Sequence, residues 1–287
     1  MKKTTRLRNA ILERRALVCP GAHDAISAML IEKAGFEALQ VSGFGLAASY
    51  LGMPDMAFLS SSHMVDFTRN IIQAVSIPVM ADADTGFGSA ANAAYATRQF
   101  ILAGAAGMNL EDQLFPKRCG HMEGKQVIPL EEMVHKIKAC IVERNSLDPD
   151  FVLNARTDAI ALEGVDSAIR RANAYVEAGA DIIFMEAVET LEQMDMVIRE
   201  VKAPVSINLF DFVSGGKTPL VSIHELRARG VGRVSIPVGP LFAAYKGMEN
   251  YLAAIASGDI PANGKDLVVT FADFKKLVRQ ECYARMG

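Results

Sequence analysis

The stretch Val165–Glu186, VDSAIRRANAYVEAGADIIFME, contains one complete structural unit. Its first part, Val165–Glu177, has a helical pattern, and Gly179 follows where a helix C-cap is expected. The short apolar run Asp181–Glu186 then predicts a strand that is buried on both faces and ends in a carboxylate. The stretch therefore predicts a helix, a glycine turn and a parallel strand.

This unit recurs along the chain. Helical patterns at Ile26–Lys33 and Ala90–Leu102 are followed by Gly35 and Gly104, and each glycine leads into another apolar run. Eight such runs are present, at Ala16–Pro20, Ala38–Ser42, Pro78–Asp82, Gly107–Glu111, Phe151–Arg156, Asp181–Glu186, Pro204–Asn208 and Arg233–Pro237. Eight β–α units predict an α/β protein with a closed (β/α)8 TIM barrel.

A doubly wound open sheet is the alternative fold, and the ends of the strands discriminate between the two. A polar residue ends or follows nearly every apolar run, and in a barrel these residues converge on one mouth. The turn Pro20–Asp24 after the first run also lacks the GxGxxG pattern of a dinucleotide-binding fold. The barrel is therefore favoured. Two further helical stretches, Leu241–Ala256 and Phe271–Arg285, complete a single predicted domain of residues 1–287.

Composition excludes several classes of partner. The 287 residues are 51% apolar and carry a net charge of −3 with both signs interspersed, which argues against binding to nucleic acid. No apolar run is long enough to predict a membrane-spanning helix, and the N-terminus has no signal-peptide core. Four cysteines without metal-binding spacing indicate a reducing compartment. We expect a cytoplasmic protein that binds neither nucleic acid nor membrane.

Three carboxylates stand at the ends of neighbouring predicted strands. Asp82 and Asp84 are two residues apart, so they are expected to point the same way, and Glu111 ends the next strand. Carboxylates crowded at a dry barrel mouth repel each other, and Mg²⁺ or Mn²⁺, which prefer oxygen ligands, would relieve that repulsion. The pattern favours a metal site, although capping aspartates of the turn Thr85–Gly88 would give the same residues.

One cysteine lies in an unusually charged loop, Lys117-Arg118-Cys119-Gly120-His121. Two cations and an imidazole beside Cys119 are expected to lower the pKa of its thiol, so that it can donate or accept a proton near neutral pH. The other three cysteines have no such neighbours. The alternative is a basic surface loop with one incidental cysteine, because a lone cysteine is more often a small buried apolar residue.

Other polar residues at the strand ends have two open interpretations. Arg156 suits a bidentate contact to a substrate carboxylate, but equally a structural ion pair with Glu186 or Asp158. The turn Ser42–Gly45 allows a ligand carboxylate to approach backbone N–H groups, or is only a turn. Glu186 and Asn208 are candidates to position substrate oxygens, or are simply hydrogen-bonded strand ends.

Together these stretches resemble the phosphoenolpyruvate mutase/isocitrate lyase superfamily. The resemblance covers roughly residues 10–285 and rests on Ser42–Gly45, Ala81–Gly88, Leu110–Gln113, Lys117–His121, Ala155–Asp158 and Asn208. The loop with Cys119 is typical of the lyase branches, because the phosphonate mutases lack it. The resemblance implies a (β/α)8 barrel whose last helix is swapped between paired subunits, commonly in a homotetramer built as a dimer of dimers.

The resemblance also implies roles for individual residues. Asp82 and Asp84 would hold Mg²⁺, with Glu111 helping through water, and Cys119 would be the general acid on a loop that closes over the site. Arg156 would help to bind the α-keto-acid half of the substrate. Further substrate contacts would come from Ser42, Gly43, Phe44, Gly120, His121, Glu186 and Asn208. Which residue removes the hydroxyl proton is left open, with Glu186 as one candidate.

The chemistry implied is a Mg²⁺-dependent cleavage of a 2-hydroxy dicarboxylate to pyruvate and a simple carboxylate. The segment Asn208–Pro219 ends in Gly-Gly-Lys-Thr-Pro, which resembles the malate-cleaving and mutase-like members more than the methylisocitrate lyases. Oxaloacetate hydrolases tend to have a serine near Pro237. We therefore expect a 2-alkylmalate lyase acting on 2,3-dimethylmalate, with 2-methylisocitrate as the runner-up. Oxaloacetate hydrolase and phosphonate mutase are less favoured, and a catalytically silent ligand-binding barrel is the non-enzymatic alternative.

Overall fold

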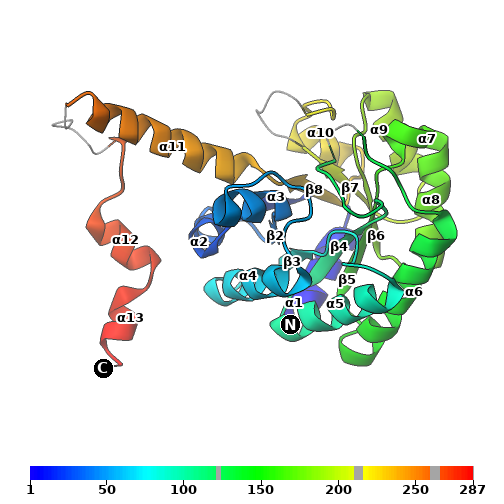
Figure 1. Ribbon diagram of the computed structural model, residues 1–287, viewed down its shortest axis with the longest axis horizontal. Coiled ribbons are helices and arrows are strands. Elements are labelled where there is room, and N and C mark those ends of the chain that lie inside the picture. The colour runs from blue at the N-terminus through cyan, green and yellow to red at the C-terminus, as the bar shows by residue number, and fades with distance from the viewer. Residues whose placement is uncertain (121–123, 210–215, 259–265, 287) are drawn as a thin grey trace. The chain divides into compact units, whose positions relative to one another are not determined.

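The computed structural model describes residues 1–120, 124–209, 216–258 and 266–286. Within these residues eight parallel strands close into a barrel in chain order, so that β8 pairs with β1 (Figure 1). The strands are β1 (Leu17–Ala22), β2 (Leu39–Val41), β3 (Val79–Asp82), β4 (Gly107–Glu111), β5 (Val152–Thr157), β6 (Ile182–Met185), β7 (Val205–Asn208) and β8 (Arg233–Ile236). The predicted (β/α)8 barrel is confirmed.

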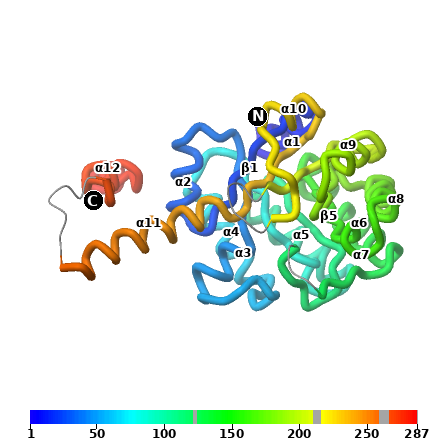
Figure 2. Tube along the Cα trace, turned by 90° about the horizontal axis from the view of Figure 1, so that it is seen from above, coloured from blue at the N-terminus to red at the C-terminus, as the bar shows by residue number. Residues whose placement is uncertain are grey.

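Helices occupy the connections and surround the strands, as Figure 2 shows from above. Up to the last strand they are α1 (Lys3–Leu12), α2 (Ala25–Lys33), α3 (Gly43–Leu46), the π-helix η1 (Ala47–Leu51), α4 (Ser61–Ala74), α5 (Ala90–Ala103), α6 (Leu130–Leu147), α7 (Ile160–Glu163), α8 (Val165–Glu177), α9 (Leu191–Glu200) and α10 (Ile223–Ala228). After it come α11 (Gly239–Ala256), α12 (Phe271–Leu277) and α13 (Gln280–Ala284). In the described part of the chain, no helix is both long and apolar enough to cross a membrane.

The glycine turns have the backbone conformation that the sequence predicts. Gly104 and Gly179 follow α5 and α8 with φ of 93° and 110°, which glycine adopts without the steric cost that a side chain would add. The prediction of one helix over Phe271–Arg285 is wrong. Arg279 has a φ of 55° and separates α12 from α13, because a left-handed residue interrupts the ladder of helical hydrogen bonds.

The chain divides into two compact units, Met1–Gly239 and Pro240–Gly287. The first unit contains the whole barrel. The helices α11, α12 and α13 bury none of their described side chains. That the C-terminal helices form one domain with the barrel stays a prediction.

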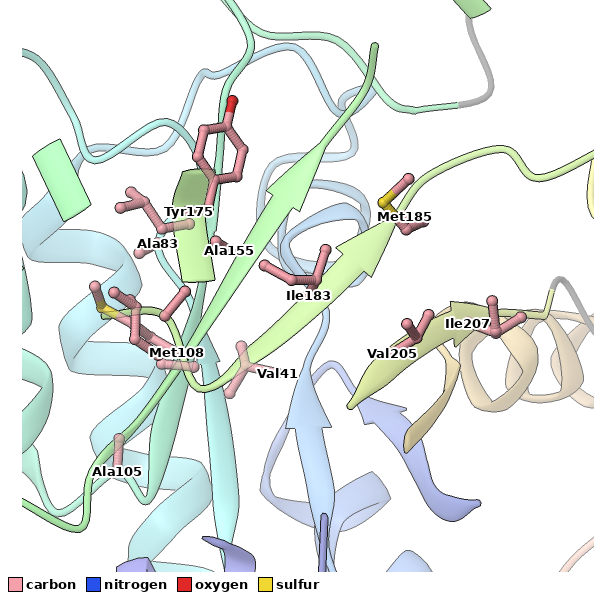
Figure 3. Close-up of a cluster of buried hydrophobic side chains, with 14 of the residues drawn as sticks. Val41, Ala83, Ala105, Met108, Ala155, Tyr175, Ile183, Met185, Val205 and Ile207 are labelled. Atoms are coloured by element: carbon pink, nitrogen blue, oxygen red, sulfur yellow. The ribbon is translucent and has the colours of Figure 1, made fainter. Parts of the chain in front are cut away.

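Alternate residues of each strand face outward and form the main core with the surrounding helices. Figure 3 shows Ala155 of β5, Ile183 of β6 and Ile207 of β7 in this cluster, and all three are fully buried. Tyr175 of α8 packs with them from the helix side. Because side chains of a strand alternate between its two faces, the residues between these positions must point into the barrel.

The inside of the barrel is apolar at the end where α1 packs and polar towards the carboxyl ends of the strands. Leu7 and Ile11 of α1 form a small buried cluster with inward-facing residues such as Met80 and Ile182. Polar residues lie further along the strands, and Asn154 of β5 donates a 2.8 Å hydrogen bond to a neighbour on β4. Buried polar groups need such partners, so this layer forms an ordered floor beneath the mouth of the barrel.

Candidate active site

A cavity of about 60 Å³ opens where the carboxyl ends of the strands meet, with room for a handful of water molecules or a small organic acid. All but two of the residues singled out from the sequence line it, namely Ser42, Gly43, Phe44, Asp82, Glu111, Cys119, Gly120, Arg156, Glu186 and Asn208. Asp84 is not among the lining residues, and His121 lies outside the described residues. The barrel therefore brings together groups from six strand ends and from the cysteine loop.

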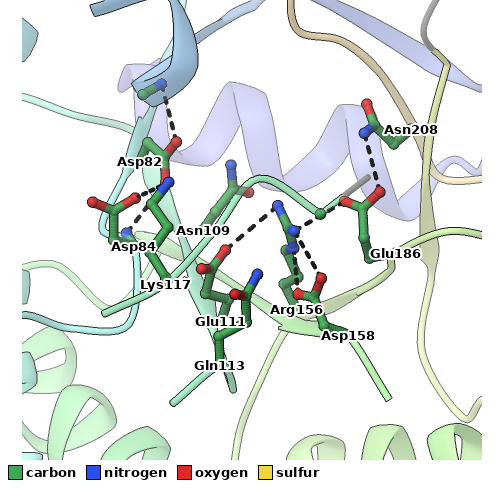
Figure 4. A network of polar contacts seen from close by, with 12 residues as sticks. Asp82, Asp84, Asn109, Glu111, Gln113, Lys117, Arg156, Asp158, Glu186 and Asn208 are labelled. Carbon is green, nitrogen blue, oxygen red and sulfur yellow. Dashed lines mark hydrogen bonds and ion pairs between the residues drawn. The ribbon is translucent and has the colours of Figure 1, made fainter. Parts of the chain in front are cut away.

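Asp82 and Asp84 do not point the same way into the mouth. The strand β3 ends at Asp82, and Asp84 has a φ of 46°, so the alternation that the sequence argument assumed stops between them. The Asp82 carboxylate accepts hydrogen bonds from Gly43 N at 3.1 Å and Asp84 N at 3.2 Å (Figure 4). A Cβ atom on Gly43 would come within 2.6 Å of Asp82 Oδ2, so a larger residue there would displace the Asp82 carboxylate.

Asp84 forms a buried ion pair with Lys117 instead. Lys117 Nζ lies 2.8 Å from Asp84 Oδ1 and 2.6 Å from Asp55 Oδ1. Burial raises the pKa of Asp84 to about 7, and the nearby Asp82 and Asp55 add to this while Lys117 opposes it. Burial alone would lower the pKa of Lys117, but the carboxylates of Asp84 and Asp55 outweigh it and raise that pKa. Asp55 was not predicted as a site residue, because it lies in a loop without a periodic pattern.

Glu111 is a buried carboxylate with spare hydrogen-bonding capacity. Burial raises its pKa well above the ordinary range, against the effect of Arg156. Its Oε2 lies 3.4 Å from Arg156 Nη1, whereas its buried Oε1 accepts no hydrogen bond from the described residues. An orphaned carboxylate oxygen beside Asp82 in one cavity suits a hard divalent cation.

The described residues contain no ready-made cage of three or more acidic, histidine or cysteine ligands. Mg²⁺ in enzymes usually takes one or two carboxylates and completes its shell with water and substrate oxygens. The donor set around Asp82 and Glu111 therefore fits the predicted cation, while the roles of these residues stay predictions.

Arg156 is the centre of a charged network at the mouth. It donates to both carboxylate oxygens of Asp158, at 2.9 and 3.0 Å, and its Nη2 lies 3.3 Å from Glu186 Oε2 (Figure 4). Burial alone would lower the pKa of Arg156, but Asp158, Glu186 and Glu111 outweigh it and raise that pKa. Its guanidinium carbon also lies 5.1 Å from the centre of the Phe184 ring. The structural ion pairs of Arg156 are present and the side chain also lines the cavity, while its contact with a substrate carboxylate stays a prediction.

Lys125, which follows the cysteine loop in the sequence, links that loop to the end of β5. Lys125 Nζ donates to Asp158 Oδ1 at 2.9 Å and to the carbonyl oxygen of Gly120. Burial alone would raise the pKa of Asp158, yet Arg156 and Lys125 lower it to about 2. A Cβ atom on Gly120 would come within 2.6 Å of Glu186 Cδ, so the loop approaches the barrel as closely as glycine allows.

Cys119 is half-buried, forms no disulfide and lines the same cavity as Asp82 and Glu111. Gln113 holds the backbone just before it, since its side chain accepts from Arg118 N at 3.0 Å and donates to Arg118 O at 2.9 Å. Lys117, one of the two flanking cations, pairs with carboxylates. The lowered pKa of the Cys119 thiol stays a prediction.

Several lining residues escaped the sequence argument. Gln40, Asn109, Phe184 and Ser235 lie within strands and also line the cavity. Alternation along each strand would predict that these side chains face inward. The strands are nearly continuous apolar runs, however, so the sequence shows no clear alternation. Asn208 Nδ2 lies 3.4 Å from Glu186 Oε1, so these two strand ends are neighbours, as expected for a barrel mouth.

Comparison with known proteins agrees with this geometry. The sequence profile of the phosphoenolpyruvate phosphomutase family matches residues 7–256. The chain belongs to the phosphoenolpyruvate mutase/isocitrate lyase superfamily. The resemblance inferred from the sequence motifs is confirmed. A superfamily relative, the 2,3-dimethylmalate lyase of Eubacterium barkeri, is 41% identical over 98% of this chain and 96% of its own length.

Two further superfamily members are similar over nearly the whole chain. The 2-methylisocitrate lyase of Aeropyrum pernix is 40% identical over 97% of this chain and 88% of its own length. A solved structure of 2,3-dimethylmalate lyase superposes with a TM-score of 0.92 at 30% identity, covering 100% of this chain and 94% of that one. The barrel and the C-terminal helices thus both have counterparts in this superfamily.

Replacing Asp158 with Asn should destabilise the protein by about 3–5 kcal/mol at pH 7, because Arg156 and Lys125 would keep their buried charges without this anion. The folded pKa of Asp158 lies below its ordinary value, so its contribution is present above about pH 4 and is lost as the pH falls towards 2. Urea unfolding at pH 7 and at pH 3 measures both effects.

The matched control is Asp66→Asn, which removes a mostly exposed aspartate paired with Arg69. That variant should change the free energy of unfolding by less than about 1 kcal/mol. Equal losses in the two variants would contradict the structural role of Asp158.

Proposed function

We propose that this protein is a Mg²⁺-dependent carbon–carbon lyase that cleaves a 2-alkylmalate, with 2,3-dimethylmalate as the expected substrate and pyruvate and propanoate as products. The observation that carries the proposal is that Asp82, Glu111 and Cys119 line one small cavity. The predicted lyase class is confirmed by the two lyase relatives. The substrate is proposed from the relative of that name and from the sequence of the cysteine loop.

Asp82 and Glu111 are the residues that would hold the cation, with Asp84 behind them and paired to Lys117. When bound, Mg²⁺ lowers the pKa of the substrate 2-hydroxyl group and binds the adjacent carboxylate. Arg156 places a fixed positive charge in the same cavity, and Ser42, Gly43 and Phe44 line the part of it where the α-keto-acid half is proposed to bind. These groups orient the hydroxyl carbon and its carboxylate.

Bond cleavage follows from proton movements at two residues. Glu186 is the proposed base, because it lines the cavity beside Arg156 and can take the proton of the 2-hydroxyl group. The oxygen forms the ketone of pyruvate, the C2–C3 bond breaks, and its electron pair passes to C3 as an enediolate. Cys119 Sγ donates its proton to C3, which gives propanoate. Solvent then returns a proton from Glu186 to the Cys119 thiolate.

A second substrate has one specific observation in its favour, the 40% identity to a 2-methylisocitrate lyase. Half of the segment that argued against it, Asn208–Pro219, lies outside the described residues. Oxaloacetate hydrolysis is less favoured because position 237, where those hydrolases tend to have a serine, is a proline that lines the cavity. A phosphonate mutase is disfavoured because the chain has the lyase-type loop around Cys119.

A pyruvate-release assay tests the substrate and the cation together. We expect turnover of 2,3-dimethylmalate with Mg²⁺ and weaker turnover of 2-methylmalate and 2-methylisocitrate. Hydrolysis of oxaloacetate would give oxalate and acetate instead of pyruvate, so it is followed by oxalate release, and we expect none. Excess EDTA should abolish turnover and added Mg²⁺ or Mn²⁺ should restore it. Faster cleavage of 2-methylisocitrate would select the runner-up, and inertness towards all four compounds would favour a silent binding barrel.

Replacing Cys119 with Ala should lower kcat by at least about 10²–10⁴-fold, the usual contribution of a general acid, while leaving the melting temperature and Mg²⁺ binding nearly unchanged. The control is Cys282→Ala, which removes an exposed thiol that is not among the cavity-lining residues. Full turnover of the Cys119 variant would show that another group protonates C3.

We also propose the homotetramer, with exchange of the last helix between paired subunits, that the family resemblance implies. In its support, α11 to α13 expose large apolar side chains, and Leu252, Phe271 and Tyr283 are 62%, 73% and 70% exposed in the single chain. A cytoplasmic location stays part of the proposal and is tested by fractionating expressing cells.

Sedimentation should show a tetramer for the full chain and a smaller species for Phe271→Asp, because a charge would stand in a buried contact. Leu102→Asp, at a 63% exposed leucine of α5, should leave the tetramer intact. A monomeric wild-type protein would exclude the assembly.

A further inference from the structure

A fully buried arginine lies beneath the cavity without a carboxylate partner. Arg233, the first residue of β8, is 0% exposed, and its Nη1 donates to Ser206 Oγ at 3.0 Å. Its Nη2 donates to Gln40 Oε1. Within the described ranges Arg233 forms no ion pair, and these two hydrogen-bond partners are neutral. Burial raises the pKa of the neighbouring Cys19 thiol, against the effect of Arg233, so that thiol stays neutral. Arginine stays protonated in proteins, so a positive charge is held here by neutral groups.

Gln40 connects this charge to the floor of the cavity. It lies on β2, and β1 separates β2 from β8, so its contacts with Arg233 and Ser235 are made across the inside of the barrel. Gln40 Nε2 donates to Ser235 Oγ at 2.7 Å. Gln40 and Ser235 both line the cavity, whereas Arg233 does not.

The donor and acceptor roles in this chain of contacts are determined by chemistry. A guanidinium only donates, so the amide atom facing Arg233 must be the oxygen of Gln40. The amide nitrogen therefore faces Ser235, and since it only donates, the Ser235 oxygen must accept. The hydroxyl hydrogen of Ser235 finds no acceptor among the described residues, although the side chain is 1% exposed.

The hydroxyl of Ser235 is thus available to donate into the cavity. Three described residues of β8 and the segment just after it line the cavity, namely Ser235, Pro237 and Val238. Ser235 is the one among them with a polar side chain. A donor supported by a buried cation favours a negatively charged oxygen, because such hydrogen bonds are stronger than neutral ones.

We propose that Arg233, Gln40 and Ser235 form a positioning relay, in which Arg233 and Gln40 hold the Ser235 hydroxyl as a hydrogen-bond donor to a carboxylate oxygen of the substrate. Ser235 is then a substrate-binding residue, and Gln40 and Arg233 are positioning residues. The relay selects acids that place a carboxylate oxygen, rather than an alkyl group, against the floor on the β8 side. It rests on the proposed function, since it names a recognition element for the proposed dicarboxylate.

The first test compares two serines that are connected to Arg233, Ser206 directly and Ser235 through Gln40. Ser235→Ala removes the proposed donor, and Ser206→Ala removes an acceptor from Arg233 without touching the cavity lining. We expect Ser235→Ala to raise KM, and to weaken calorimetric binding of 2,3-dimethylmalate to the Mg²⁺-loaded Cys119→Ala protein, by about 10- to 100-fold. For Ser206→Ala we expect a lower melting temperature and an affinity within about twofold of the parent.

The second test reverses the relay while keeping a partner for Arg233. In Gln40→Glu a carboxylate faces the guanidinium, so folding should be retained, but both of its oxygens accept, and the Ser235 hydroxyl turns towards Glu instead of the cavity. Affinity for the dicarboxylate should fall about as far as in Ser235→Ala. In the Gln40→Glu background, adding Ser235→Ala should cost nothing further.

The double variant Gln40→Glu/Ser235→Ala distinguishes the relay from direct repulsion between the new carboxylate and the substrate. If the new carboxylate only repelled the substrate, Ser235→Ala would still cost its full factor in the Gln40→Glu background, and that result overturns the relay. Unchanged affinity in Ser235→Ala, or equal losses in the Ser235 and Ser206 variants, overturns it as well.

Failure of the proposed function is visible separately. The wild-type protein would then release no pyruvate from any compound in the panel, while the relay is judged by calorimetric binding of oxalate and 2,3-dimethylmalate with Mg²⁺. A cavity that binds neither acid would overturn the relay.

Discussion

Burying a charge is costly unless an opposite charge or several hydrogen bonds compensate for it, and at the mouth of the barrel opposite charges do so. Lys117 at one end of the cysteine loop pairs with Asp55 and Asp84, and Lys125 at the other end pairs with Asp158. Both lysines are almost fully buried, so neither pair is easily replaced by water. The position of Cys119 over the cavity follows from these two attachments.

The same requirement links the loop to the catalytic cavity. Asp158 binds Lys125 of the loop and Arg156 of the mouth at once, and Arg156 in turn reaches Glu111 and Glu186. Charges in such a network interact strongly, because water is excluded by the apolar cluster around α1 inside the barrel and by the packed helices outside it. The groups proposed to bind and cleave the substrate are therefore oriented before it arrives.

Some residues that line the cavity belong to the superfamily motifs and others do not. The motifs that carry the resemblance supply the turn at Ser42, the acidic strand ends and the cysteine loop. Gln40 and Ser235 lie outside these motifs, yet they form the floor on the β8 side and depend on Arg233 beneath it. The fold and these motifs are shared across the superfamily, and the floor on the β8 side is the part of the cavity proposed to set the choice of substrate.

The sequence by itself determined the closed barrel, because helical spacing, glycine turns and apolar runs are local patterns that reflect backbone hydrogen bonding and burial. It also placed most site residues at the strand ends, where barrel topology brings them together. Only the tertiary structure decided that Asp84 turns to Lys117, that Asp55 joins them, and that Arg233 supports Gln40. These contacts join residues 62 and 193 positions apart, and pairing at such separations depends on distance in space, which no local pattern records.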